Sequence, residues 1–210
     1  MFFFSPIFKI IKWIFLVLVG LFIILVIGRV IYRLNEAKTN EQVIKIHNTK
    51  LTLDDVMGKN LPPDPGALAD ATVQGVDANN NGIRDDVELA IFKEYPNSAK
   101  TRAVLLQYAL ALQMEVIQPI VNTKTATEII TEQGRADTCI SDILVPRKTP
   151  ESDRNYSDIE KIDVFVNFVK NRQFNTEERK LARMSFLESL RSYGNSTNKT
   201  CDIDISKLSN

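Results

Sequence analysis

An uncharged apolar run near the amino terminus limits what this chain can fold into more than any other feature. Residues 13–28 contain no charged side chain, but they are shorter than the ~20 residues that a helix needs to span a bilayer. Extending the run to residues 10–32 supplies the length, because Lys12 and Arg29 can snorkel towards the head groups. We therefore predict a transmembrane helix over residues 10–32, preceded by a cytoplasmic amino terminus over residues 1–9.

A cleaved signal peptide is the alternative for this run. Such peptides end in a small-x-small cleavage site. The apolar run is instead followed by Arg29-Val30-Ile31-Tyr32. An uncleaved, single-pass signal anchor is therefore favoured.

Residues 77–88 carry the second informative pattern, Asp-Ala-Asn-Asn-Asn-Gly-Ile-Arg-Asp-Asp-Val-Glu. Oxygen-bearing side chains occupy alternate positions, and Gly82 permits a sharp turn. Calcium is a hard cation that takes six to eight oxygens at roughly 2.3–2.6 Å, and the spacing matches D-x-[DN]-x-[DN]-G-x5-E completely. The candidate Ca²⁺ ligands are Asp77, Asn79, Asn81, Ile83 through its main-chain carbonyl, Asp85 and Glu88.

The twelve residues resemble the calcium loops of the EF-hand and dockerin group, which implies Ca²⁺ as the cofactor. The chain departs from the EF-hand pattern at position eight, where Arg84 replaces a branched apolar residue and Ile83 lies one place early. The preceding residues 62–75 are rich in Pro and Gly and unsuited to a long entering helix. We therefore expect an EF-hand-like loop with a helix only on its carboxyl-terminal side.

A wider segment, residues 61–88, looks like part of a group of uncharacterised bacterial envelope proteins. In that group a Leu-Pro-Pro-Asp-Pro segment precedes such a loop, as it does here at residues 61–65. This resemblance implies a membrane-anchored envelope protein, and it implies no activity.

A metal-free Asn-Gly turn that caps a helix is the alternative to a calcium loop. Asp85 and Asp86 would then favour the positive end of the helix dipole. If the loop does bind calcium, the two neutral ligands Asn79 and Asn81 point to a weak site, with a dissociation constant on the order of 10⁻⁴ M or weaker. Such a weak site would bind calcium in an extracytoplasmic space and stay empty in the cytosol. Because sensors normally pair two loops, a single loop favours a structural ion.

The two cysteines, Cys139 and Cys201, form an isolated pair. In a membrane-anchored exported domain one pair suggests one disulfide, which would close a loop of about 62 residues and stabilise the domain by roughly 4 kcal/mol. Two buried free thiols are the alternative. A catalytic thiol is not expected, because the single histidine, His47, lies beside the membrane segment.

Charge around the apolar run does not decide its orientation. Basic residues flank the run on both sides: Lys9 and Lys12 before it, and Arg29, Arg33 and Lys38 after it. The positive-inside rule therefore predicts no orientation. The calcium loop and the cysteine pair both suit an extracytoplasmic space. We therefore expect a protein of the cell inner membrane whose carboxyl-terminal domain is periplasmic or otherwise extracytoplasmic.

The remaining chain suffices for one domain. We expect a juxtamembrane segment over residues 33–60 and a single domain over 61–210. Residues 36–210 hold all 26 acidic residues and 22 of the 26 Lys and Arg, a net charge of −4. A mildly acidic domain without a basic patch argues against a nucleic-acid partner.

Helix signals dominate after the loop, and we predict an all-α domain of about five helices. Pro96 and Pro119 end two of them, a capping box at Ser157 opens another, and Gly194 ends the last. Residues 43–53 alternate weakly and fit a short strand pair or a continued helix. The predicted helices cover residues 85–95, 98–118, 124–141 and 176–193, with a further helix that opens at Ser157 and extends past Val169.

No catalytic motif accompanies these features. The chain lacks Gly-x-Ser-x-Gly, His-Glu-x-x-His, Walker and Rossmann patterns. We expect a membrane-anchored calcium-binding protein with a structural or interaction role, another envelope protein as partner and no small-molecule substrate. The alternative is a carboxylate-dependent envelope hydrolase. Its acidic pairs would be Asp85/Asp86 or Asp202/Asp204.

Overall fold

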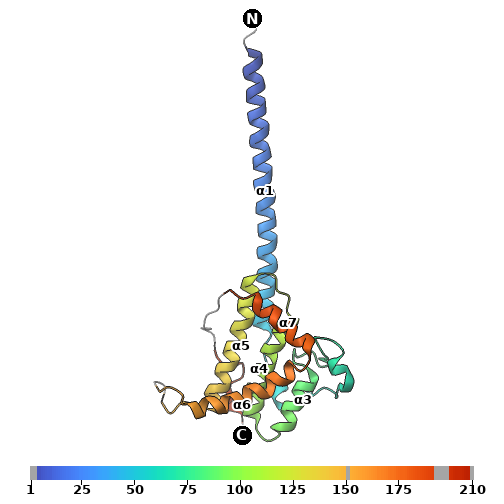
Figure 1. Cartoon of the computed structure of the whole chain (residues 1–210), viewed down its shortest axis with the longest axis vertical. Helices are drawn as coiled ribbons and strands as arrows, with labels where there is room; N and C mark the ends of the chain where they lie inside the picture. Colours follow the sequence, from blue (N-terminus) through green and yellow to red (C-terminus); the bar gives the residue numbers. More distant parts are fainter. Residues whose placement is uncertain (1–3, 150–151, 192–198, 209–210) are drawn as a thin grey trace. The chain divides into compact units, whose positions relative to one another are not determined.

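The computed structural model describes residues 4–149, 152–191 and 199–208 (Figure 1). About 70% of the chain is helical, and the described residues contain no β-strand. The all-α prediction is therefore confirmed. The chain forms two compact units, Met1–Glu41 and Gln42–Asn210.

The first unit consists of the long helix α1 (Phe4–Asn48) as far as Glu41. Its apolar side chains are largely exposed, including Trp13, Phe22 and Leu25. By length and composition α1 is the one helix in the described part of the chain that could cross a membrane, a test that a signal sequence also passes. The predicted span, residues 10–32, lies wholly within it.

The second unit starts with the last turns of α1. Residues 43–48 continue that helix, so of the two structures considered for residues 43–53 the continued helix is the one observed, as far as Asn48. Residues 42–60, placed by sequence in a juxtamembrane segment, belong to this unit, and Ile46 lies in its core. The other elements are α2 (Leu53–Met57), the 3-10 turn η1 (Gly66–Asp70), α3 (Asp85–Glu94), α4 (Ala99–Ile117), α5 (Thr123–Leu144), α6 (Tyr156–Gln173), α7 (Glu177–Glu188) and the 3-10 turn η2 (Ile205–Lys207).

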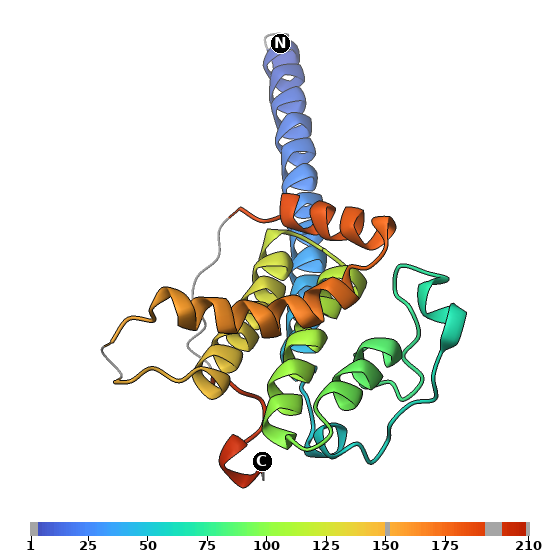
Figure 2. The same ribbon diagram turned by 60° about the horizontal axis from the view of Figure 1, so that its bottom comes forward.

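Helix α4 is the centre of the second unit. It contacts α2, α3, α5, α6 and α7, and every residue from Arg102 to Glu115 is buried. Burial on all sides explains why the helix carries apolar residues on almost every face. Figure 2 shows α4 among α3, α5 and α6. Ser98 caps its first turn by accepting a hydrogen bond from the main-chain N–H of Thr101 at 3.2 Å.

One predicted helix start is wrong by two residues. Sequence pattern placed the capping box of α6 at Ser157, but the cap is Asn155, whose Oδ1 accepts from the main-chain N–H of Asp158 at 2.9 Å. Asn and Ser are equally good caps, so the local pattern did not distinguish them. The predicted end of the last helix at Gly194 lies outside the described residues.

A disulfide joins Cys139 of α5 to Cys201 in the carboxyl-terminal tail, which confirms the predicted pair. Beside it, Arg135 forms ion pairs with Glu132 and, at 2.8 Å, with Asp202. The disulfide and these buried charges together fix the tail against α5. The tail thereby becomes part of the folded unit.

Candidate metal centre

The predicted calcium loop connects η1 to α3. Its backbone takes positive φ angles at Asn80 (57°) and Gly82 (85°), a region that Gly and Asn tolerate best. A Cβ atom on Gly82 would lie 2.7 Å from Cδ1 of Leu110 in α4. The positive φ angle therefore favours glycine here, and any larger residue would also displace the side chain of Leu110.

Side chains within the loop bend it around a common centre. Asp77 accepts main-chain N–H bonds from Asn81 at 3.1 Å and from Gly82 at 2.9 Å. Asn81 in turn accepts from the N–H of Ile83 at 2.9 Å. These local bonds between side chains and main chain hold Asp77 and Asn81 within the turn.

The carboxylate of Glu88 closes this arrangement from the first turn of α3. It is 1% exposed, and its Oε2 accepts the side-chain amide N–H groups of Asn79 and Asn81, each at 3.1 Å. Burial raises the pKa of Glu88 to about 7. In the described part of the chain no Lys, Arg or His pairs with this carboxylate, so a buried acid faces two amides without a compensating positive charge.

The residue types of the loop suit a calcium ion better than their present hydrogen bonds do. Asn79 and Asn81 direct N–H groups at Glu88, and a cation there would need their oxygens turned to the same point. Turning them would give up the bonds from Asn79 to the carbonyl of Asn60 and from the N–H of Ile83 to Asn81. Glu88 would then supply carboxylate oxygens to the same point. Hard oxygen donors of this kind suit calcium.

Asp85 and Ile83 have different roles in the structure. Asp85 is fully buried, and its two oxygens accept from the main-chain N–H of Ala78 at 3.0 and 3.2 Å. Burial raises its pKa. Its own N–H donates to the carbonyl of Val76 at 2.9 Å, so Asp85 closes the base of the loop. The side chain of Ile83 lies in the core.

No group of three or more His, Cys, Asp or Glu side chains gathers at one point within the described ranges. The loop has few acidic side chains that could form such a group, because two ligand positions carry the neutral residues Asn79 and Asn81. The side chain of Asp85 accepts from Ala78 at the base of the loop. Hydrogen bonds bring together Asp77, Asn79, Asn81 and Glu88, while the metal itself stays a prediction.

A groove of about 660 Å³ lies beside the loop. Asp77, Asn79 and Asn81 line it, whereas the buried Glu88 does not. The groove is also lined by residues from the start of the second unit, from α2 and from α4. These residues include Lys45, Lys50, Asp55, Leu110 and Met114.

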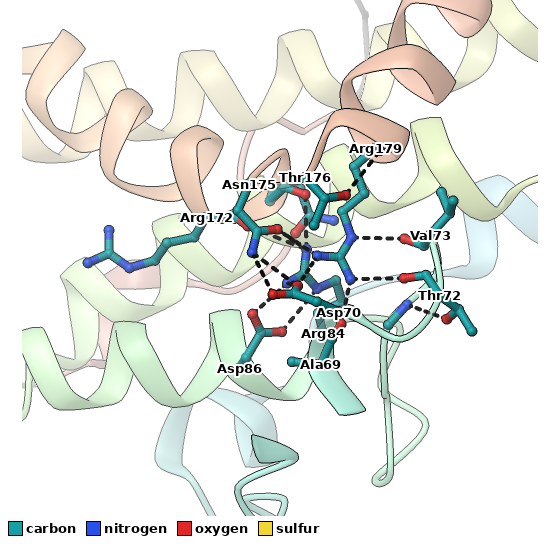
Figure 3. Close-up of polar contacts among 12 residues, drawn as sticks. Ala69, Asp70, Thr72, Val73, Arg84, Asp86, Arg172, Asn175, Thr176 and Arg179 are labelled. Atoms are coloured by element: carbon teal, nitrogen blue, oxygen red, sulfur yellow. Dashed lines mark hydrogen bonds and ion pairs between the residues drawn. The ribbon is translucent and has the colours of Figure 1, made fainter. Parts of the chain in front are cut away.

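Arg84, at the eighth loop position, is the residue whose role sequence reasoning missed. Its guanidinium is completely buried and donates to the carbonyl of Gln173 at 3.0 Å and to Asp86 at 2.5 Å (Figure 3). Burial lowers its pKa, and the charge of Asp86 opposes this. The departure from the EF-hand pattern thus marks a polar attachment to the end of α6.

A second buried arginine, Arg179 of α7, completes this cluster (Figure 3). It donates to Asp70 at 2.5 Å and to the carbonyls of Ala69, Thr72 and Val73 at 2.5, 3.0 and 3.0 Å. Its hydrogen bond lowers the pKa of Asp70. The segment before the calcium loop is therefore attached to α7, although its sequence has no helix-forming pattern.

The acidic pairs considered for hydrolysis have structural partners. Asp85 and Asp204 accept hydrogen bonds, and Asp86 and Asp202 form ion pairs with arginines. Their respective partners are Ala78, Ser206, Arg84 and Arg135. Each carboxylate therefore has a role in the fold, and no observation singles out a catalytic pair among them.

Comparison with protein-family models, with curated proteins and with solved structures finds no match to this chain.

Proposed function

We propose that this chain is a membrane-anchored calcium-binding protein of the bacterial cell envelope, with a structural or interaction role. The observation that carries the proposal is the buried carboxylate of Glu88, which meets the amides of Asn79 and Asn81 without a cationic partner. A divalent cation at that point would compensate its charge. The loop's resemblance to the EF-hand and dockerin group supports the same ion.

Each residue contributes a defined part of the proposed site. Asp77 and Glu88 supply two negative charges, which match the charge of the ion. Asn79 and Asn81 supply neutral oxygens, and the carbonyl of Ile83 is the ligand expected at position seven. With half of the side-chain ligands neutral, we expect a dissociation constant on the order of 10⁻⁴ M or weaker.

The position of the loop suits a structural ion. Asp77 precedes the turn and Glu88 belongs to α3, so an ion held by both would fasten the turn to the helix. Arg84 already attaches the loop to the end of α6. Asp85 already closes the base of the loop. Ion binding would therefore strengthen an existing connection within the unit.

Two features support an extracytoplasmic location. The disulfide between Cys139 and Cys201 suits an oxidising compartment, and a calcium site of this weakness suits a compartment rich in calcium. With α1 as a candidate anchor, the proposal places the second unit outside the inner membrane. The interaction role predicts another envelope protein as partner.

Thermal unfolding of the full-length protein in detergent micelles tests the calcium proposal. We expect the melting temperature of the second unit to rise between excess chelator and millimolar calcium. At a calcium concentration ten times the dissociation constant, the gain in free energy of unfolding is about 1.4 kcal/mol. For a unit of this size, each kcal/mol raises the melting temperature by about 2–4 °C. Glu88→Gln should lose the gain. Equal melting temperatures with chelator and calcium would refute the proposal.

A further inference from the structure

The turn between α4 and α5 exposes apolar side chains at its tip. Pro119, Ile120 and Val121 follow one another there and are all exposed, Ile120 by 39% and Val121 by 40%. A single exposed apolar residue needs no explanation, whereas a contiguous apolar set marks a surface that contacts a partner or a membrane. The turn is therefore a candidate interaction surface.

Helix α7 carries a second exposed apolar set at the same end of α4. Leu181, Met184 and Leu187 are 62%, 57% and 41% exposed, and their spacing of three residues places them on one side of the helix. Arg183 pairs with Glu115, in the last turns of α4, at 3.0 Å. Helix α7 therefore packs against the end of α4 from which the turn leaves.

The chain also enters the second unit at this end. Gln42 is the first residue of the unit, and its Nε2 donates to Oε1 of Gln118 at 2.7 Å in a buried position. Gln118 immediately precedes the exposed turn. The chain entry, the turn 119–121 and α7 are thus gathered at the carboxyl-terminal end of α4.

A short tether limits how far this end can lie from the bilayer. The predicted span ends at Tyr32, so residues 33–41, nine in all, precede Gln42. Nine residues reach at most about 30 Å when fully extended and about 14 Å as a helix. The tether therefore presents the exposed apolar side chains to a lipid surface at high effective concentration, where even a weak affinity keeps them bound.

Charge does not direct this surface towards a strongly charged partner. Helix α7 contains three acidic and three basic residues. Opposite charges pair, Lys180 with Glu177 at 2.6 Å and Arg183 with Glu115 at 3.0 Å. The exposed apolar side chains favour a partner with an apolar interior and both signs of charge at its surface, which describes a bilayer with zwitterionic head groups.

We propose that the turn 119–121 and the exposed side of α7 rest on the bilayer that holds the predicted anchor. Their apolar side chains would lie at the boundary between head groups and acyl chains. This proposal rests on the membrane anchoring in the proposed function. It gives the second unit a fixed orientation, in which the opposite end of α4, next to α3, faces away from the membrane.

Fluorescence quenching by phospholipids that are brominated in their acyl chains tests the proposal. The full-length protein is placed in nanodiscs of brominated or unbrominated phosphatidylcholine, one chain per disc, with a polarity-sensitive probe on Met184→Cys or, separately, on Val121→Cys. Labelling without reductant leaves the native disulfide intact. An interfacial apolar face lies about 5–10 Å deep, so we expect about twofold quenching at both positions. Because the charges of α7 balance, the quenching should persist at high salt.

Tyr156→Cys, labelled in the same way, is the matched control. Tyr156 is 76% exposed and follows Arg154, which pairs with Asp142 near the end of α5 at 2.8 Å. Helix α5 starts beside the exposed turn and has 22 residues, which span about 33 Å. We therefore expect no quenching of the probe at this position.

The proposal is overturned if the probes at Met184 and Val121 are quenched no more than the probe at Tyr156. It is also overturned if the Met184 probe becomes buried only when several chains share a larger bilayer, because a second copy would then cover the surface. Trp13, the single tryptophan, lies in the predicted span, and its quenching in the unlabelled protein reports the anchor. Unquenched Trp13 would refute the membrane anchoring itself, whereas quenched Trp13 with unquenched probes refutes only the contact made by the second unit.

Discussion

The guanidinium of Arg84 donates a hydrogen bond to the main-chain carbonyl of Gln173 at 3.0 Å. This contact joins the eighth residue of the calcium-loop candidate to the end of α6, 89 positions away. A branched apolar side chain at the same position could not make it. The loop of this chain is therefore attached to its domain by a polar contact where the EF-hand pattern has an apolar one.

Replacing Arg84 by isoleucine, the kind of residue that the EF-hand pattern has there, should destabilise the second unit. The change leaves the Gln173 carbonyl and Asp86 without their partner in a buried environment, at a cost on the order of 3 kcal/mol. Chemical denaturation of the full-length protein in micelles measures this. Lys93→Ile in α3 is exposed and should stay within about 0.5 kcal/mol of wild type. Equal stability of the two variants would contradict the role assigned to Arg84.

Arg84 also shows where sequence reasoning reached its limit. Its departure from the loop pattern is visible in the sequence, but its partners come from α6 and from the connection to α7. The same holds for Arg179, whose partners lie in residues 69–73. Local patterns predict the elements, whereas contacts between residues 88 to 110 positions apart depend on how those elements pack.

Removing the disulfide should destabilise the second unit without abolishing its helices. Cys139→Ser with Cys201→Ser frees the tail from α5, and we expect a loss of about 4 kcal/mol on the chain-entropy estimate. Denaturation of the oxidised protein, the reduced protein and the double variant measures the loss. Thiol labelling of the denatured, unreduced wild-type protein is the companion test. Full labelling of both cysteines there would contradict the bond.

Stability should depend on pH through the buried Glu115 of α4. Burial raises the pKa of Glu115 to about 7, although Arg183 pairs with it at 3.0 Å. Between pH 4.5 and 7 the folded state keeps a proton that the unfolded state releases, so this group's contribution falls as pH rises through that window, by on the order of 3 kcal/mol.

Denaturation of calcium-free protein at several pH values checks this effect. The Glu115→Gln variant should lose the part of the slope that Glu115 contributes, because glutamine does not titrate. Glu160→Gln, at an exposed position of α6, should retain the wild-type slope. Identical slopes for wild type and Glu115→Gln would show that burial of this carboxyl group does not govern the pH dependence.

The proposed topology predicts the compartment of the carboxyl terminus. A reporter enzyme that becomes active only in an oxidising compartment, fused after Asn210, should be active in the full-length protein. Placing charged residues within residues 13–28 should release the fusion from the membrane fraction, because a charge at the centre of a spanning helix is costly. A reporter active only in the cytoplasm would reverse the orientation.

Most of the helical elements could be predicted from the sequence because their signals are local. The all-round apolar pattern of α4 and the prolines that limit it are examples. The site was accessible only in part. The spacing of Asp77, Asn79, Asn81 and Glu88 identified the loop, but the closing role of Asp85 depends on the fold of the chain around it.

Calorimetric titration of the full-length protein with calcium, beside its Glu88→Gln variant, is the decisive measurement of calcium binding by residues 77–88. We predict a saturable heat of binding for one ion per chain, with a dissociation constant on the order of 10⁻⁴ M or weaker. The Glu88→Gln variant should show no such heat in the same range. If the wild-type protein produces no heat of calcium binding at millimolar concentrations, or if the variant binds equally well, residues 77–88 are a metal-free turn.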